Sequence, residues 1–181
     1  MAKLIRHRRL TSDSWQPLDH DVERWLTPGE DGFVPAFPAD ADLIVPLRLW
    51  RLRREDLLER PGRSGVRLAV DDNPGELAAD LERLALVAVE FPKFSDGRGF
   101  STGRLLRERY GFRGELRAVG DVLRDQLLFL ERCGFDAFAL RDDQDVGAAL
   151  AAFDDFTDAY QASVDRPVPL FRRRLAAGAI A

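Results

Sequence analysis

A polar, glycine-rich segment over residues 90–101, EFPKFSDGRGFS, has the composition of an anion-binding loop. Lys93 and Arg98 supply cationic donors, while Gly97 and Gly99 would let the backbone approach a ligand closely. A helix expected to begin at the end of this segment would direct its unpaired N–H groups at the same space. The segment therefore predicts a site for an oxyanion or for the phosphate of a cofactor.

A purely structural interpretation of the same residues stays open beside this one. In it, Gly97 and Gly99 only shape a turn. Ser101 then caps the following helix, and Arg98 forms an ion pair with Asp96. The residue types alone do not separate a ligand site from a well-capped loop.

A dinucleotide fingerprint is a third interpretation, and the spacing argues against it. Gly97, Gly99 and Gly103 give a loose G-x-G-x-x-x-G pattern. In the authentic fingerprint the first glycine closes the strand directly, whereas here five residues separate Phe91 from Gly97. A flavin or nicotinamide cofactor is therefore an option that no fingerprint supports.

A second polar cluster follows the next expected strand, over residues 115–119. It comprises Arg117, Gly120, Asp121, Arg124, Asp125 and Gln126. Alternation along the strand directs Arg117 to the inside or the rim of the sheet, where it needs an anionic partner. Glu90 on the neighbouring strand is one candidate, and a structural ion pair between the two is the interpretation we prefer. Asp121 is most simply the N-cap of the following helix.

No catalytic residue stands out in these clusters. Glu90 and Asp121 are weak candidates, because either carboxyl could act as a general acid or base if burial raised its pKa. Eight residues are assigned to binding of an anion, another ligand or a partner: Lys93, Asp96, Gly97, Arg98, Gly99, Ser101, Arg117 and Arg124.

The composition excludes several kinds of site. Cys133 is the only cysteine of the 181 residues, so the chain has no internal disulfide and no motif for an iron–sulfur cluster, a heme or a structural zinc site. His7 and His20 both lie in the N-terminal part, which leaves the regular core without a histidine base or metal ligand. The net charge of −4 provides no basic field for nucleic acid. No apolar run approaches the about 20 residues needed to span a membrane, and we expect a cytoplasmic protein.

Expected strands and helices alternate from Asp42 onwards. Strands are predicted over residues 43–47, 65–70, 85–91, 115–119 and 135–140. Helices are predicted over residues 49–60, 74–83, 101–110, 122–133 and 146–160. The alternation indicates an α/β fold with a mainly parallel sheet of about five strands, either an open sheet or a truncated TIM-like barrel. In both arrangements ligands bind at the carboxyl ends of the strands, where the two polar clusters would meet.

The α/β core domain is expected to cover residues 42–160. Residues 1–41, which contain Trp15, Trp25 and four prolines, are expected to form an irregular segment packed on this core. Residues 161–181 are expected to form a mobile C-terminal tail. Because an open sheet exposes two edges, the fold is also compatible with a homodimer.

Two stretches resemble a known family. The sequence VEFPKFSDGRGFS at residues 89–101 and the sequence GELRAVGDVLRDQLLFLERCGFDAF at residues 114–138 are similar to a bacterial family of unknown function. Members of that family are commonly described as oxidoreductases of sulfite reduction. The resemblance implies a companion of the sulfite reductase hemoprotein in assimilatory sulfur metabolism, and it transfers no catalytic residue.

Two functions follow as expectations. The first is an accessory protein that supports or docks to sulfite reductase or its electron donor, with Arg98, Arg117 and Arg124 as contact residues. The alternative is an oxidoreductase, or another enzyme that binds an anion or a phosphate-bearing cofactor, with Lys93 and Arg98 holding the charge. The absence of built-in redox groups favours the accessory role.

Overall fold

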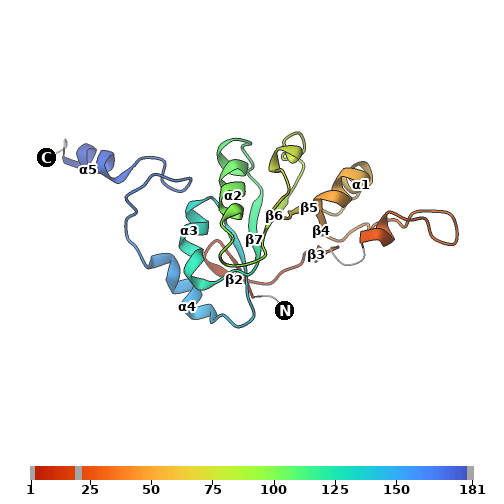
Figure 1. Ribbon diagram of the computed structural model, residues 1–181, viewed down its shortest axis with the longest axis horizontal. Coiled ribbons are helices and arrows are strands. Elements are labelled where there is room, and N and C mark those ends of the chain that lie inside the picture. Colours follow the sequence, from red (N-terminus) through yellow and green to blue (C-terminus); the bar gives the residue numbers. More distant parts are fainter. Residues whose placement is uncertain (1–2, 19–21, 179–181) are drawn as a thin grey trace.

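The computed structural model describes residues 3–18 and 22–178, and His20 lies outside these residues. Its single sheet has eight strands in the spatial order β2-β1-β8-β7-β6-β5-β4-β3. The strands are β1 (Lys3–Arg6), β2 (Arg9–Thr11), β3 (Gln16–Pro17), β4 (Leu43–Pro46), β5 (Ser64–Leu68), β6 (Leu86–Phe91), β7 (Glu115–Gly120) and β8 (Ala137–Leu140). Figure 1 shows α1, α2 and α3 beside this sheet and α5 apart from it.

The sheet combines a parallel centre with one antiparallel edge. Strands β3 to β8 are parallel and lie side by side in chain order, whereas β1 and β2 extend the β8 edge in antiparallel pairing. The sheet curls into a half barrel. The predicted α/β class and mainly parallel sheet are confirmed, but the prediction of about five strands is wrong. The additional strands come from residues 3–17, because backbone groups there pair with exposed sheet edges that the core alone would leave open.

The helices are short. They are α1 (Leu47–Glu59), α2 (Arg98–Glu108), α3 (Leu127–Arg132), α4 (Val146–Ala151) and α5 (Leu170–Gly178). Single turns of 3-10 helix form at η1 (Val22–Trp25), η2 (Pro74–Leu77), η3 (Arg124–Gln126) and η4 (Ala152–Asp154). The predicted helices over 122–133 and 146–160 are therefore too long, since each contains one short α-helix joined to a 3-10 turn.

The helix predicted over residues 74–83 is the clearest error in secondary structure. Asn73 does cap the segment, because its side chain accepts a hydrogen bond from the Gly75 N–H at 2.9 Å. The chain then leaves helical geometry after one 3-10 turn. Asp80 explains the departure, because its buried carboxylate accepts hydrogen bonds from Trp50 Nε1 at 3.1 Å and from Arg54. These tertiary bonds to α1 replace helical bonds that the local sequence favours.

The two faces of the sheet are covered differently. On the helical face, side chains such as Val87, Val89 and Phe91 of β6 belong to the large core. On the opposite face, Trp15 packs with Ile44, Leu86 and Ala88 in a second, smaller cluster. Residues from the N-terminal segment thus cover part of the face that carries no helix.

Within the described residues, no helix is both long and apolar enough to cross a membrane.

Candidate functional site

Loops at the carboxyl ends of β6, β7 and β8 are linked into one surface. We call this the strand-end surface and define it as residues 92–98, 120–126 and 141–144. It contains most of the side chains that the sequence assigned to binding, together with others that the sequence did not single out.

Asp121 joins the three loops. Its Oδ2 accepts a hydrogen bond from the Phe94 N–H at 2.8 Å, and its Oδ1 lies 2.6 Å from a guanidinium nitrogen of Arg141. Arg141 also pairs with Asp143 at 2.7 Å, and these hydrogen bonds lower the pKa of the Asp143 carboxyl to about 2. The prediction that Asp121 caps a helix is wrong, because its carboxylate is used to connect neighbouring loops.

Phe94 is held firmly but is exposed. Its N–H donates to Asp121, and its carbonyl oxygen accepts from Gln126 Nε2 at 3.0 Å. The residue is nevertheless 61% exposed to solvent. Beside it, the ammonium of Lys93 forms no hydrogen bond or ion pair with any residue that the structure describes. Sequence reasoning missed Phe94, although a large apolar residue inside a polar loop was an available signal.

Arg98 is already neutralised by carboxylates of the chain. Its guanidinium binds both carboxylate oxygens of Asp96 at 3.0 and 2.7 Å and reaches Asp71 at 2.5 Å. The Arg98 N–H also donates to Asp96. These hydrogen bonds from Arg98 lower the pKa of the Asp96 carboxyl. The structural interpretation, in which Arg98 forms an ion pair with Asp96, is therefore confirmed.

The glycines of this segment serve mainly to pack α2. Gly97 is the N-cap residue of α2, so Ser101 lies inside the helix and is not its cap. A Cβ on Gly99 would lie 2.6 Å from the ring of Phe91, and one on Gly103 would lie 2.3 Å from the ring of Phe135. Gly99 and Gly103 are thus required because α2 approaches the core closely.

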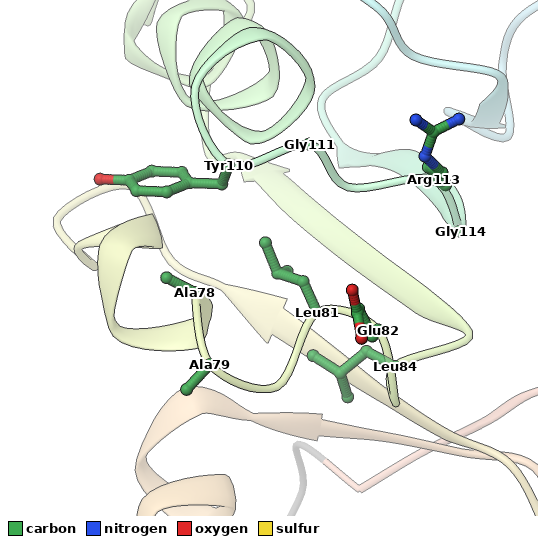
Figure 2. Close-up of a pocket in the computed structure, with 9 residues that line it drawn as sticks. All are labelled: Ala78, Ala79, Leu81, Glu82, Leu84, Tyr110, Gly111, Arg113 and Gly114. Carbon is green, nitrogen blue, oxygen red and sulfur yellow. The ribbon is translucent and has the colours of Figure 1, made fainter.

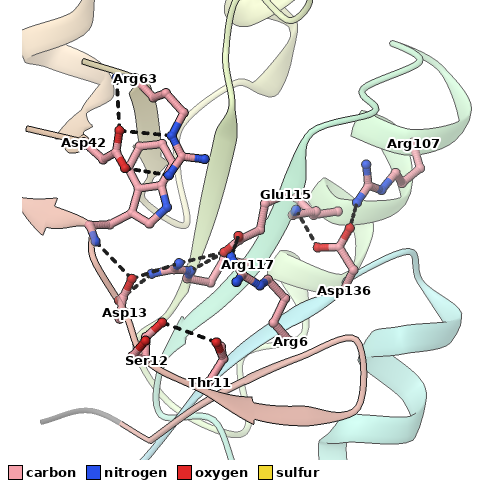
Figure 3. Close-up of polar contacts among 12 residues, drawn as sticks. Arg6, Thr11, Ser12, Asp13, Asp42, Arg63, Arg107, Glu115, Arg117 and Asp136 are labelled. Atoms are coloured by element: carbon pink, nitrogen blue, oxygen red, sulfur yellow. Dashed lines mark hydrogen bonds and ion pairs between the residues drawn. The ribbon is translucent and has the colours of Figure 1, made fainter.

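Arg117 lies away from the strand-end surface, in a buried ionic network (Figure 3). Its side chain is 2% exposed and binds Asp13 at 2.7 Å and Glu115 at 2.7 Å. Glu115 in turn binds Arg6 at 3.3 Å. The prediction that Glu90 pairs with Arg117 is wrong. Glu90 lies opposite Val119, two residues further along β7 than Arg117 and on the same face of the sheet.

The other assigned side chains have separate surroundings. Arg124 binds Asp155 at 3.0 Å and the carbonyl oxygen of Ala148, which ties it to α4 and the segment after it. Glu90 is partly buried, and its carboxylate makes no hydrogen bond or ion pair within the described part of the chain. No hydrogen bond joins the side chains of Glu90 and Asp121 among these residues, so the two catalytic candidates do not form a hydrogen-bonded pair.

Within residues 3–18 and 22–178, no group of three or more acidic, cysteine or histidine side chains is placed to hold a metal ion. Cys133 is buried, and desolvation raises the pKa of its thiol, as suits a core residue.

A cavity of about 520 Å³ lies at the opposite ends of two of the same strands, the amino ends of β6 and β7. Figure 2 shows it between the loop after η2 and the C-terminal end of α2. Its lining includes Leu81, Leu84 and Tyr110 with the charged side chains of Glu82 and Arg113. None of the assigned site residues reaches it.

Comparison with known proteins gave one match. Residues 65–171 match the model of a family described as "Bacterial protein of unknown function (DUF934)". The matched range contains β6 to β8, all but the first residue of β5, the strand-end surface and α2 to α4. No curated protein and no solved structure matched the chain.

Proposed function

The chain belongs to this bacterial family of unknown function, and from that premise we propose that it is an accessory protein of assimilatory sulfite reduction in the cytoplasm. In this proposal the strand-end surface docks to sulfite reductase or to its electron donor. The link to sulfite reduction rests on the resemblance of residues 89–101 and 114–138 described above.

The docking proposal rests on one observation: the ring of Phe94 is exposed, while the backbone of the same residue is held by two hydrogen bonds. Residues that dominate protein interfaces are often aromatic and gain from being held in place before binding. Both backbone polar groups of Phe94 are satisfied by Asp121 and Gln126, so the loop loses little conformational freedom when a partner covers the ring.

Lys93 extends this surface with a positive charge. Because its ammonium has no partner within the described residues, it is available to a carboxylate on another protein. An exposed charge of this kind raises the association rate more than it tightens the complex. The partner surface is therefore expected to present an apolar pocket with an acidic rim.

A binding assay with purified sulfite reductase tests this proposal. The Phe94→Ala variant is expected to bind at least about tenfold more weakly, because a central aromatic contact is lost. Phe33→Ala is the matched control, since Phe33 is 75% exposed in a different loop. Absence of wild-type binding to both the reductase and its electron donor, or equal binding by the two variants, would exclude docking through this surface.

An oxidoreductase that binds a phosphate-bearing cofactor is the second candidate. The ammonium of Lys93 favours it, because it has no partner among the described residues and Lys93 precedes α2 by five residues in the sequence. The carboxylates on Arg98 argue against it, because an incoming phosphate would have to displace Asp96 and Asp71. An absorbance spectrum of the purified protein separates the candidates, since a stoichiometric flavin that Lys93→Ala loses would establish the enzyme.

A further inference from the structure

The C-terminal arm, which we define as residues 156–178, leaves many apolar side chains in water. Its large exposed apolar residues are Phe156, Tyr160, Val168, Phe171 and Leu175, with exposed fractions from 48% to 72%. Scattered single apolar residues are normal on a protein surface, but a concentration of this kind marks a surface that another molecule covers.

The middle of the arm is attached to α3. The Ser163 hydroxyl and the Val164 N–H both donate to the Arg132 carbonyl oxygen, at 2.6 and 3.1 Å. Within the arm itself, Arg166 and Arg173 each bind Asp158 at 2.8 Å. Figure 1 shows α5 standing clear of the sheet and of the helices that cover it.

Helix α5 has one apolar side whose two large side chains are exposed. Phe171 and Leu175 are four residues apart and therefore lie on the same side of the helix. Arg172 and Arg174 flank them, and neither forms an ion pair with a described residue. The helix therefore presents an apolar stripe bordered by positive charge.

A second apolar surface lies where α2 meets α3, and we call it the α2–α3 patch, formed by Phe100 and Phe129. The rings of Phe100 and Phe129 are 4.9 Å apart, and Phe129 is 54% exposed. Asp125 lies four residues before Phe129. Its carboxylate pairs with Arg124 at 3.3 Å and is still 84% exposed.

We propose that the C-terminal arm of one copy packs on the α2–α3 patch of a second copy, and that the exchange is reciprocal. The two surfaces are complementary, since the arginines of α5 would approach Asp125 while Phe171 and Leu175 cover Phe129. A reciprocal exchange closes a twofold dimer and leaves neither surface free.

The available area suits a stable dimer. At about 200 Å² for each aromatic residue, the exposed fractions of Phe129 and of the three aromatic residues of the arm amount to about 500 Å² per copy. Val168 and Leu175 add to this aromatic surface. The total approaches the about 800 Å² that each partner contributes to a standard interface.

Solution mass gives the first test. In sedimentation equilibrium, the 181-residue chain is expected to show twice its monomer mass of 20.4 kDa. The double variant Phe171→Ser with Leu175→Ser is expected to dissociate at a concentration at least about tenfold higher, because both apolar contacts are lost. Leu52→Ser is the matched control, because Leu52 is 60% exposed on α1. A monomeric wild type, or a dimer that the double variant leaves intact, overturns the proposal.

Disulfide trapping between two differently substituted chains gives the second test. Leu175→Cys and Phe129→Cys chains are mixed and oxidised, and a crosslinked dimer containing one chain of each kind is expected. The native Cys133 is buried and does not compete. A third chain carries both substitutions. If this chain forms the disulfide within itself and the mixed chains form none between them, the arm folds onto its own α3 and the proposal is wrong. Phe94→Ala is expected to leave the dimer unchanged, so failure of the docking proposal and failure of this one are distinguishable.

Discussion

Arg117 and Arg98 each bind two carboxylates, yet they do so in opposite surroundings. The Arg117 side chain is 2% exposed, and the Arg98 side chain is 58% exposed. Arg117 joins the N-terminal segment to the middle of the sheet through Asp13, whereas Arg98 joins neighbouring loops at the carboxyl ends of the strands. The same pairing chemistry therefore holds the fold together in one region and shapes a surface in the other.

The difference matters because the two kinds of ion pair have different energetics. Removing one partner of a buried pair leaves an uncompensated charge, which is costly. An exposed pair is screened by water and adds little to stability. The contacts of Arg98 and Arg141 are therefore better understood as fixing the loop conformation around Phe94 than as stabilising the protein.

Substitution of Arg117 is expected to have the largest effect. Arg117→Ala should lower the free energy of unfolding by about 3–5 kcal/mol, because Asp13 and Glu115 lose their buried cation. Urea denaturation measures this loss. Arg98→Ala is the comparison, and its urea midpoint is expected to equal that of wild type within measurement error. Equal losses in both variants would contradict the distinction between the two regions.

Gly99 gives the next largest effect. Gly99→Ala should lower the free energy of unfolding by about 1–3 kcal/mol, because the new methyl group meets the Phe91 ring. Gly97→Ala, two residues earlier, meets nothing within 4 Å and is expected to cost less than about 0.5 kcal/mol. If Gly97→Ala were the more damaging change in urea denaturation, the packing role assigned to Gly99 would be wrong.

One buried carboxyl, Asp80, and one partly buried carboxyl, Asp136, should respond to pH with opposite sign. Hydrogen bonds from Arg54, and then from Trp50, hold the pKa of Asp80 below 3.8, so the stability it contributes is lost as the pH falls through its folded pKa. Desolvation raises the pKa of Asp136 above 3.8. Ionisation of Asp136 therefore lowers the stability of the folded protein as the pH rises from 3.8 through the folded pKa.

Acid denaturation measures this difference. Between about pH 5 and about pH 3, Asp80→Asn should show a smaller loss of unfolding free energy than wild type, because it removes a carboxyl that must be protonated. Asp136→Asn should show a larger loss over the same interval. A pH dependence identical to wild type in both variants would refute these assignments.

The smallest expected effect is local and concerns the backbone of Phe94. Asp121→Ala removes the acceptor of the Phe94 N–H, so hydrogen exchange at this amide should accelerate about tenfold, as expected for loss of a charge-assisted hydrogen bond. Asp143→Ala removes the other carboxylate on Arg141 and should leave the Phe94 amide unchanged. Equal acceleration in both variants would show that Arg141, rather than Asp121, holds the loop.

Local patterns predicted those elements whose evidence lies in nearby residues. The continuous apolar run at residues 85–91 predicted β6 within one residue, because a strand buried on both faces needs no polar alternation. The turn at Gly111 was also predictable, since its φ of 68° is one that glycine adopts readily. By contrast, the helix predicted after Asn73 failed, because Asp80 finds its partners on α1 rather than in its own segment.

The sequence by itself determined the α/β class, the central parallel strands and the placement of polar loops at their carboxyl ends. These follow from hydrophobic periodicity and glycine positions, which act over a few residues. Only the tertiary structure decided that Asp13 pairs with Arg117 across 104 residues, that Asp121 clamps Phe94, and that Gly99 faces the core. The physical reason is that a charge or a small residue is compatible with many partners, and the packing of distant segments selects which partner it meets.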